Sequence, residues 1–266
     1  MNIVVCVKYV PDATADRHFE DDFTVDRDGT PGLLSELDEY AVEQALQLRE
    51  KRPDEEVTVT ALSVGPEKAT DAVRKALQMG ADAGVLVTDE AIAGSDYVAT
   101  SLVLAKAIEK IGAETPVDLV VCGMASTDAS GSVVPAMLAE RLGLPQVTFA
   151  SAVEVDGSTI RVRRDGDAAT ETVEGTLPLL LSVTDQSNEP RYPSFKGIMA
   201  AKKKPVAELT LADLGVDAGT VGMDAAWTKV TGFEARPPRS AGTIVSDEDG
   251  TGADQLVEFL AGQKFI

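Results

Sequence analysis

Short apolar segments alternate with amphipathic segments along the first half of this chain. Residues 2–7, 57–64, 85–87 and 117–123 are short, mainly apolar segments, the pattern of strands buried on both faces of a parallel sheet. Between these runs, apolar residues recur every three or four positions, as they do in helices that pack one face on a sheet. The alternation predicts an open, mostly parallel α/β sheet with helices on both faces. In such sheets, ligands bind at the carboxyl ends of the strands, where the strand order reverses.

The pattern changes after Pro145. Residues 147–155 and 159–164 flank a hairpin signal, Asp156-Gly157, and together with the buried run 177–183 they predict an antiparallel addition to the parallel core. The predicted nucleotide-type α/β domain therefore covers residues 1–187.

A less regular C-terminal arm is predicted from residue 206 to 266. Its clearest element is a terminal helix over residues 254–260. Because the arm has little core of its own, we expect it to pack across a partner.

Composition and charge exclude several classes of protein. The chain has 44 Asp and Glu against 24 Lys and Arg, a net charge of −20, which argues against binding to nucleic acid. No apolar run approaches the roughly 20 residues that span a bilayer, and the N-terminus lacks a signal-peptide pattern, so we expect a cytoplasmic protein. Cys6 and Cys122 lie in predicted strands and are expected to be inert thiols.

Residues 188–205 form a segment of unusual composition. Three prolines interrupt it, and Tyr192, Phe195, Ile198 and Met199 are interspersed with cationic residues. The segment has the pattern of neither a strand nor an ordinary helix. An apolar patch rimmed by charge is typical of a docking surface, although a loop that packs on its own domain would have the same composition.

The loop at residues 123–135 is the best candidate for binding a ligand. Small and hydroxyl residues between a strand and a helix expose backbone amides that suit a phosphate, but they also suit an ordinary capped helix. The loop is neither a Walker loop nor the Gly-x-Gly-x-x-Gly fingerprint. No metal site or convincing catalytic set is present, which favours a carrier or subunit over an enzyme; an ATP-using or nucleotide-sensing domain is the alternative.

Several ordered motifs resemble the β subunit of electron transfer flavoprotein. The 188–205 segment, NEPRYPSFKGIMAAKKKP, is similar to the family signature, and further matches extend over nearly the whole chain: residues 4–12, 41–46, 76–82 and 144–148. The resemblance implies a Rossmann-like core of the adenine nucleotide α-hydrolase type. It also implies a heterodimer with a larger α subunit, on which the C-terminal arm would pack.

The resemblance further implies an electron carrier of fatty acid β-oxidation. FAD would be shared with, and held mainly by, the α subunit, and AMP would be buried in this chain. Electrons would pass from acyl-CoA and similar dehydrogenases to ETF:quinone oxidoreductase and the respiratory chain. The alternative is a bifurcating complex with a second FAD in place of AMP. That group shares the turn Val10-Pro11-Asp12, but the loop after Asp128 lacks its usual Asp-Gly-x-Thr-Ala-Gln run.

The resemblance assigns site residues by position in the motifs. The adenosine would be flanked by Cys6, Val64, and Ser35 to Asp38 at a helix start where Ser35 is the expected N-cap. The phosphate would be surrounded by Asp128, Ala129, Ser130, Gly131, Ser132, Val133 and Val134. Many members have Asn, Gln or Thr in the last four positions, so backbone amides are expected to replace side-chain donors.

The same resemblance assigns the partner contacts. Phe195 takes the place of the family's anchoring aliphatic residue in the recognition loop, with Tyr192, Ile198 and Met199 as neighbours. Asp165 falls at an acidic position thought to hold the flavin domain through an arginine of the α subunit.

Overall fold

The computed structural model describes residues 1–234, 237, 242–247 and 250–266. These form two units, Met1–Thr231 and Gly232–Ile266. Residues 235–236, 238–241 and 248–249 of the predicted C-terminal arm lie outside the described residues.

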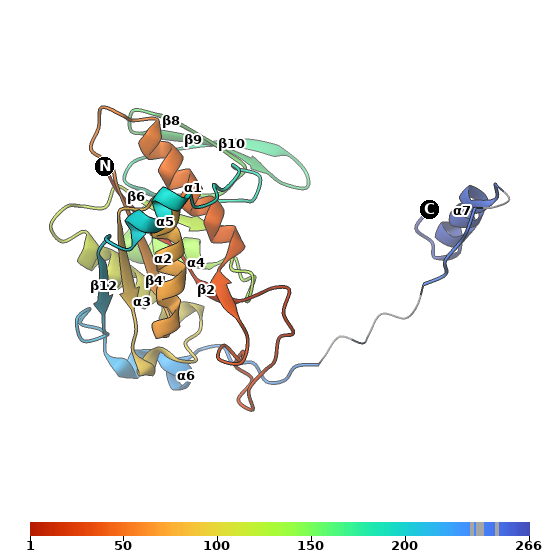
Figure 1. The fold of residues 1–266 in the computed structure, drawn as a ribbon, viewed down its shortest axis with the longest axis horizontal. Helices are drawn as coiled ribbons and strands as arrows, with labels where there is room; N and C mark the ends of the chain where they lie inside the picture. Colours follow the sequence, from red (N-terminus) through yellow and green to blue (C-terminus); the bar gives the residue numbers. More distant parts are fainter. Residues whose placement is uncertain (235–236, 238–241, 248–249) are drawn as a thin grey trace. The chain divides into compact units, whose positions relative to one another are not determined.

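A seven-stranded sheet forms the centre of the first unit (Figure 1). All of its neighbouring strands run parallel, in the order β12-β5-β4-β1-β6-β11-β7. The strands are β1 (Asn2–Cys6), β4 (Thr58–Val64), β5 (Ala83–Val87), β6 (Leu119–Gly123), β7 (Gln146–Ala150), β11 (Leu179–Val183) and β12 (Val206–Leu209). From β1 the chain adds strands first on one side and then on the other, so the order reverses between β1 and β6. The predicted α/β class is confirmed.

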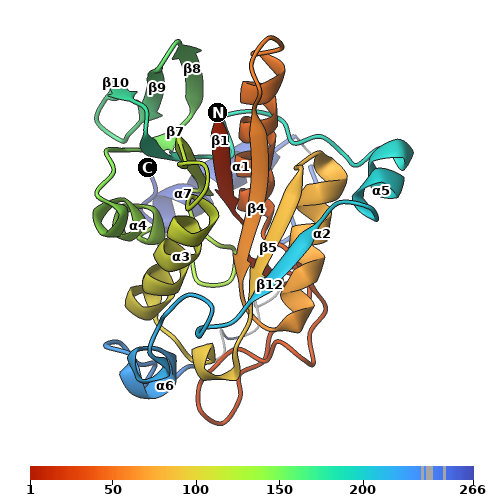
Figure 2. The same ribbon diagram turned by 90° about the vertical axis from the view of Figure 1, so that its left-hand side faces the viewer.

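Two layers of helices cover the sheet (Figure 2). One apolar cluster joins α1 (Glu36–Glu50) and α2 (Thr70–Met79) to one face, and a second joins α3 (Tyr97–Ile111) and α4 (Val134–Leu142) to the other. Short turns of helix complete this unit: η1 (Glu67–Ala69), η2 (Glu90–Ile92), η3 (Ala218–Thr220) and α6 (Gly222–Ala225).

A separate antiparallel sheet contains the predicted hairpin. It is formed by β8 (Ala152–Asp156), β9 (Thr159–Asp165) and β10 (Thr170–Thr176). The hairpin is confirmed, but the antiparallel part is smaller than predicted, because β7 and β11 belong to the parallel sheet. β11 is buried along its full length, which is the normal environment of a central parallel strand.

A long loop returns to the sheet after β1. β2 (Tyr9–Pro11) pairs with β3 (Gly32–Leu34), and the intervening residues carry one isolated bridge between Phe19 and Val25. The pairing of β2 with β3 brings Arg17 and Arg27 of this loop to the carboxyl edge of the large sheet.

The 188–205 segment, whose sequence has the pattern of neither a strand nor an ordinary helix, contains a short helix that this pattern did not predict, α5 (Phe195–Ala201). The hydroxyl of Ser194 accepts a hydrogen bond from the Gly197 amide at 3.1 Å and caps the helix. The prolines at 190 and 193 precede the helix, where they interrupt no helical hydrogen bond.

The second unit contains α7 (Gly252–Gly262), as predicted for the terminal helix. Leu256, Val257 and Phe259 are each more than half exposed. Among the described residues, no helix combines the length and apolar character needed to cross a membrane.

Candidate functional site

The reversal of strand order places the carboxyl ends of β1 and β6 side by side. Cys6 and Val64 end β1 and β4 and are partly buried, as a wall for a ligand would be. Cys6 lies beside the buried Cys122, and both thiols are free. The contact with Cys6, reinforced by burial, raises the pKa of the Cys122 thiol, which favours its neutral form.

Asp128 is the charged centre of the site. Its side chain is only 2% exposed and pairs with Lys8 Nζ at 2.9 Å and with Arg27 Nη2 at 2.7 Å. Burial opposes ionisation of this carboxyl, but Lys8, Ser126 and Arg27 outweigh it and hold its pKa well below the usual range. The 123–135 loop is therefore fixed to β1 and to the long loop by charge.

Asp38 lies beside this cluster and behaves differently. The Lys8 amide donates to its Oδ2 at 2.8 Å, and the Gly123 amide also donates to it. Burial nevertheless raises its pKa from 3.8 to about 7. Glycine is needed at 123 because a Cβ there would lie 2.6 Å from Asp38 Oδ1 and 2.8 Å from the Leu37 carbonyl oxygen.

Ser35 occupies the predicted N-cap position of α1 but does not cap the helix with its side chain. Its hydroxyl instead accepts a hydrogen bond from the Thr127 amide at 3.4 Å. The structure therefore brings Asp128 to Ser35 and Asp38, which lie about 90 residues earlier in the sequence at the start of α1.

The backbone at residues 128–134 contains two serines in the left-handed conformation. Ser130 and Ser132 have φ of 50° and 55°, a conformation that turns successive amides toward one side. Within the described part of the chain, the amides of residues 131–134 donate to no other group, and Thr127 Oγ1 is buried without a partner. These donors fit a phosphate, whereas Val133 and Val134 supply no side-chain donor.

Lys8 and Arg27 are the site residues that the sequence analysis missed. Lys8 is the second residue after β1, so its place at the reversal of strand order is a usable signal. Arg27 offers no such signal, because only the closure of the long loop brings its guanidinium to Asp128.

The apolar side chains that the sequence predicts to dock a partner lie at the opposite edge of the sheet, where α1 and α2 end. Tyr192 is 93% exposed and Phe195 80% exposed, while Ile198 and Met199 are exposed by 37% and 47%. α5 packs against α2, and Gly197 lies so close that a Cβ would be 2.6 Å from the Gln78 carbonyl oxygen. The segment thus rests on its own domain through its backbone and presents its large apolar side chains outward.

Asp165 lies apart from both groups, at the end of β9 in the antiparallel sheet. It accepts from Ser151 Oγ at 2.5 Å, Thr170 Oγ1 at 3.0 Å and Arg163 Nε at 3.2 Å. Hydrogen bonds from Ser151 and Thr170 lower its pKa, so it is ionised at neutral pH.

Comparisons with known proteins now identify the family. The sequence model described as "Electron transfer flavoprotein domain" matches residues 22–214. Two mycobacterial proteins named electron transfer flavoprotein subunit beta, from Mycobacterium bovis and Mycobacterium leprae, are each 47% identical over 268 residues, covering 100% of this chain and 99% of theirs. The chain belongs to the family of electron transfer flavoprotein β subunits. The Megasphaera elsdenii β subunit is 35% identical over 272 residues, covering both chains fully.

Membership in this family confirms the resemblance drawn from the motifs. It makes the chain an electron-transfer subunit of a flavoprotein, and the designation β implies an α partner. The match covers the full chain, including the strand β1 and the C-terminal residues that lie outside the matched domain.

Proposed function

We propose that this chain pairs with an α subunit to form an electron carrier whose FAD is held mainly by α. Acyl-CoA and similar dehydrogenases reduce the carrier, and ETF:quinone oxidoreductase reoxidises it. The observation that carries the proposal is the outward display of Phe195, at the start of helix α5, and of Tyr192, three residues before it. Such exposed aromatics on an otherwise polar surface are typical anchors of a protein interface.

Flavin supplies the redox chemistry when it is bound, and this chain contributes binding and orientation. Asp165 is ionised and accessible, so we propose that it holds the flavin-carrying domain through an arginine of the α subunit. The apolar side chains on α5 bind the dehydrogenase, so flavin orientation and partner docking fall to different parts of the chain.

For the site between β1 and β6 we propose AMP. The amides of residues 131–134 would hold the phosphate, and Cys6, Val64, Ser35 and Asp38 would flank the adenosine. The donor set is sufficient for one phosphate and is supported on the far side by the Asp128 cluster. The nucleotide is then a structural part of the carrier, because it joins loops from three strands.

A second FAD in place of AMP, as in a bifurcating complex, is the alternative. The specific observation in its favour is the presence of Lys8, Arg17 and Arg27 around the 123–135 loop, with Arg17 Nη1 donating to the Thr127 carbonyl oxygen at 3.3 Å. Several cations beside a phosphate loop suit a diphosphate as well as a monophosphate.

The test is the nucleotide content of the heterodimer produced with its α subunit. After denaturation, the proposal predicts one FAD and one AMP for each heterodimer, whereas two FAD and no AMP would establish the alternative. Mixing the same preparation with a reduced acyl-CoA dehydrogenase should bleach the flavin absorbance. A heterodimer that is not reduced by any such dehydrogenase would contradict the proposed donors.

A further inference from the structure

Helix α5 is too short to hold its own shape. It has seven residues, well below the length at which an isolated helix persists in water. Ala201 is its one buried residue, so little apolar packing fixes it to the domain. Its defined position, with Phe195 pointing outward, must therefore depend on other attachments.

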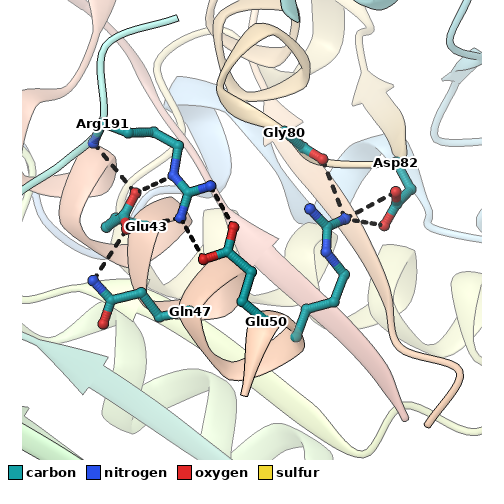
Figure 3. Close-up of polar contacts among 7 residues, drawn as sticks. Glu43, Gln47, Glu50, Gly80, Asp82 and Arg191 are labelled. Carbon is teal, nitrogen blue, oxygen red and sulfur yellow. Dashed lines mark hydrogen bonds and ion pairs between the residues drawn. The ribbon is translucent and has the colours of Figure 1, made fainter. Parts of the chain in front are cut away.

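The first attachment is Arg191, which precedes the helix. Its guanidinium lies between two carboxylates of α1, with Nε 2.7 Å from Glu43 Oε2 and Nη1 2.5 Å from Glu50 Oε1 (Figure 3). Glu43 is only 5% exposed, and it also accepts from the Arg191 amide at 3.2 Å. The Glu43 carboxylate is therefore shielded from solvent, unlike one in an ordinary surface salt bridge, although Arg191 is one-third exposed. The hydrogen bonds to Glu43 and Glu50 raise the pKa of Arg191.

The second attachment is Lys204, which follows the helix. Its ammonium donates to the carbonyl oxygens of Leu77 at 3.0 Å and Ala81 at 2.5 Å, at the carboxyl end of α2. A cation is favourable there because the last carbonyls of a helix lack partners and carry partial negative charge. Burial lowers the pKa of Lys204, in keeping with an ammonium turned into the protein. Lys202 and Lys203, by contrast, are exposed.

The two helices that carry these attachments, α1 and α2, are bonded to each other. Arg49 of α1 donates to the Gly80 carbonyl oxygen at 3.2 Å and to Asp82 at 2.9 Å, which ties the end of α1 to the end of α2 (Figure 3). The residues that hold the two ends of α5 are thus held in turn to each other.

We propose that Arg191 and Lys204 are positioning residues that hold α5 in its docking orientation before any dehydrogenase binds. The inference rests on the proposed docking role of Phe195. Its physical basis is that a partner which binds an ordered segment does not have to supply the entropy of ordering it. Loss of either attachment frees α5 to sample other positions. The fraction of molecules whose α5 is in the docking orientation then falls.

The decisive variant is Lys204→Met, with Lys203→Met as its matched control in the complete heterodimer. Each variant removes one ammonium from the same segment, but only Lys204→Met removes one of the two attachments of α5, Arg191 and Lys204, which we call its clamps. At high ionic strength, where exposed charges are screened, Lys204→Met should raise the dehydrogenase concentration for half-maximal flavin reduction by about 3- to 10-fold. The rate at saturating dehydrogenase should not change, and Lys203→Met should match the wild type.

Arg191→Met, with the exposed Arg74→Met on α2 as control, tests the other clamp in the same way. Hydrogen exchange supplies a readout that needs no dehydrogenase. The amides of residues 195–201 should exchange about tenfold faster in either clamp variant, while the rest of the chain and the flavin content stay unchanged. Arg191→Lys, which keeps the charge but loses the paired geometry, should recover only part of the protection.

The outcomes separate this inference from the docking proposal. If Phe195→Ala has no effect on half-saturation, the docking role is wrong, and exchange at residues 195–201 still decides whether the clamps order α5. If Phe195→Ala weakens docking but both clamp variants behave as their controls in exchange and half-saturation, the positioning role is overturned.

Discussion

The two edges of the parallel sheet use charge for opposite purposes. At the carboxyl edge, Lys8 and Arg27 surround the buried Asp128 and hold in place the loop that we propose binds the AMP phosphate. At the amino edge, Arg191 and Lys204 hold a short helix whose apolar side chains face outward. Charged groups thus form part of the proposed nucleotide site at the carboxyl edge. At the amino edge they only hold the helix that carries the apolar side chains. A variant at one edge should therefore leave the function of the other intact.

The largest effect should follow Asp128→Asn. The substitution leaves Lys8 and Arg27 without their buried carboxylate, and because both cations are about one-third exposed we expect a loss of about 2–3 kcal/mol in folding stability. Bound nucleotide should be lost, while half-saturation by dehydrogenase stays unchanged. Denaturant unfolding and nucleotide analysis measure the two effects. Asp28→Asn, which breaks an exposed pair with Lys68, is the control and should cost little.

Two matched glycines offer the cleanest test of independence. A Cβ at Gly123 would clash with Leu37 and Asp38, and a Cβ at Gly197 would clash with the Gln78 carbonyl oxygen. Each alanine variant should therefore cost about 1–3 kcal/mol in local stability, because backbone on the far side cannot move aside easily.

The two alanine variants should differ in what they impair. Gly123→Ala should reduce nucleotide retention alone, and Gly197→Ala should weaken docking alone, as measured by nucleotide content and by flavin reduction. Equal losses of both properties in either variant would show that the edges are coupled.

Asp38 gives the carboxyl edge a pH dependence between about pH 4 and pH 7. Its folded-state pKa, about 7, lies above its ordinary value of 3.8, so the folded chain retains this proton to higher pH than the unfolded chain does. The contribution of Asp38 therefore lowers stability as pH rises from about 4 to about 7, by about 3–4 kcal/mol.

Asp38→Asn should remove this part of the pH dependence. Melting temperatures of the heterodimer between pH 5 and pH 8 would reveal it as a flatter profile than that of the wild type. A wild-type slope in the variant would mean that Asp38 is already ionised at pH 5. Asp128 does not contribute to the pH dependence measured between pH 5 and pH 8, because its lowered pKa places its titration below this range.

The smallest effect should come from the exposed lysines beside the helix. Replacing both Lys202 and Lys203 by methionine should slow association with a dehydrogenase about two- to fivefold at low ionic strength, because exposed charges act mainly on encounter rates. The difference should vanish at high salt. A loss that persists at high salt would indicate direct contact with the partner in place of steering.

The sequence predicted the parallel core because its strands are short, mainly apolar segments that alternate with helices of one apolar face. It singled out the 123–135 loop because small and hydroxyl residues at a strand-to-helix junction suit a phosphate, although they suit an ordinary capped helix equally. The prediction that β7 and β11 belong to the antiparallel part was wrong, because an apolar segment does not reveal which strand it pairs with.

The charged partners could not be predicted for a different reason. Arg27 meets Asp128, Arg191 meets Glu43, and both contacts bridge more than one hundred residues of sequence. Helix α5 was missed because prolines at 190 and 193 hide a helix that begins immediately after them. Its cap, Ser194, and its clamp, Lys204, have meaning only when α1 and α2 are in place.

The central claim is that the 188–205 segment is the docking surface and is independent of the nucleotide site. It is tested most directly by rapid-mixing measurement of flavin reduction in the Phe195→Ala heterodimer against a range of reduced acyl-CoA dehydrogenase concentrations. Removing a buried anchor costs about 2 kcal/mol or more, so half-saturation should require at least about 30-fold more dehydrogenase, with FAD and AMP content unchanged. Wild-type half-saturation in this variant would contradict the account.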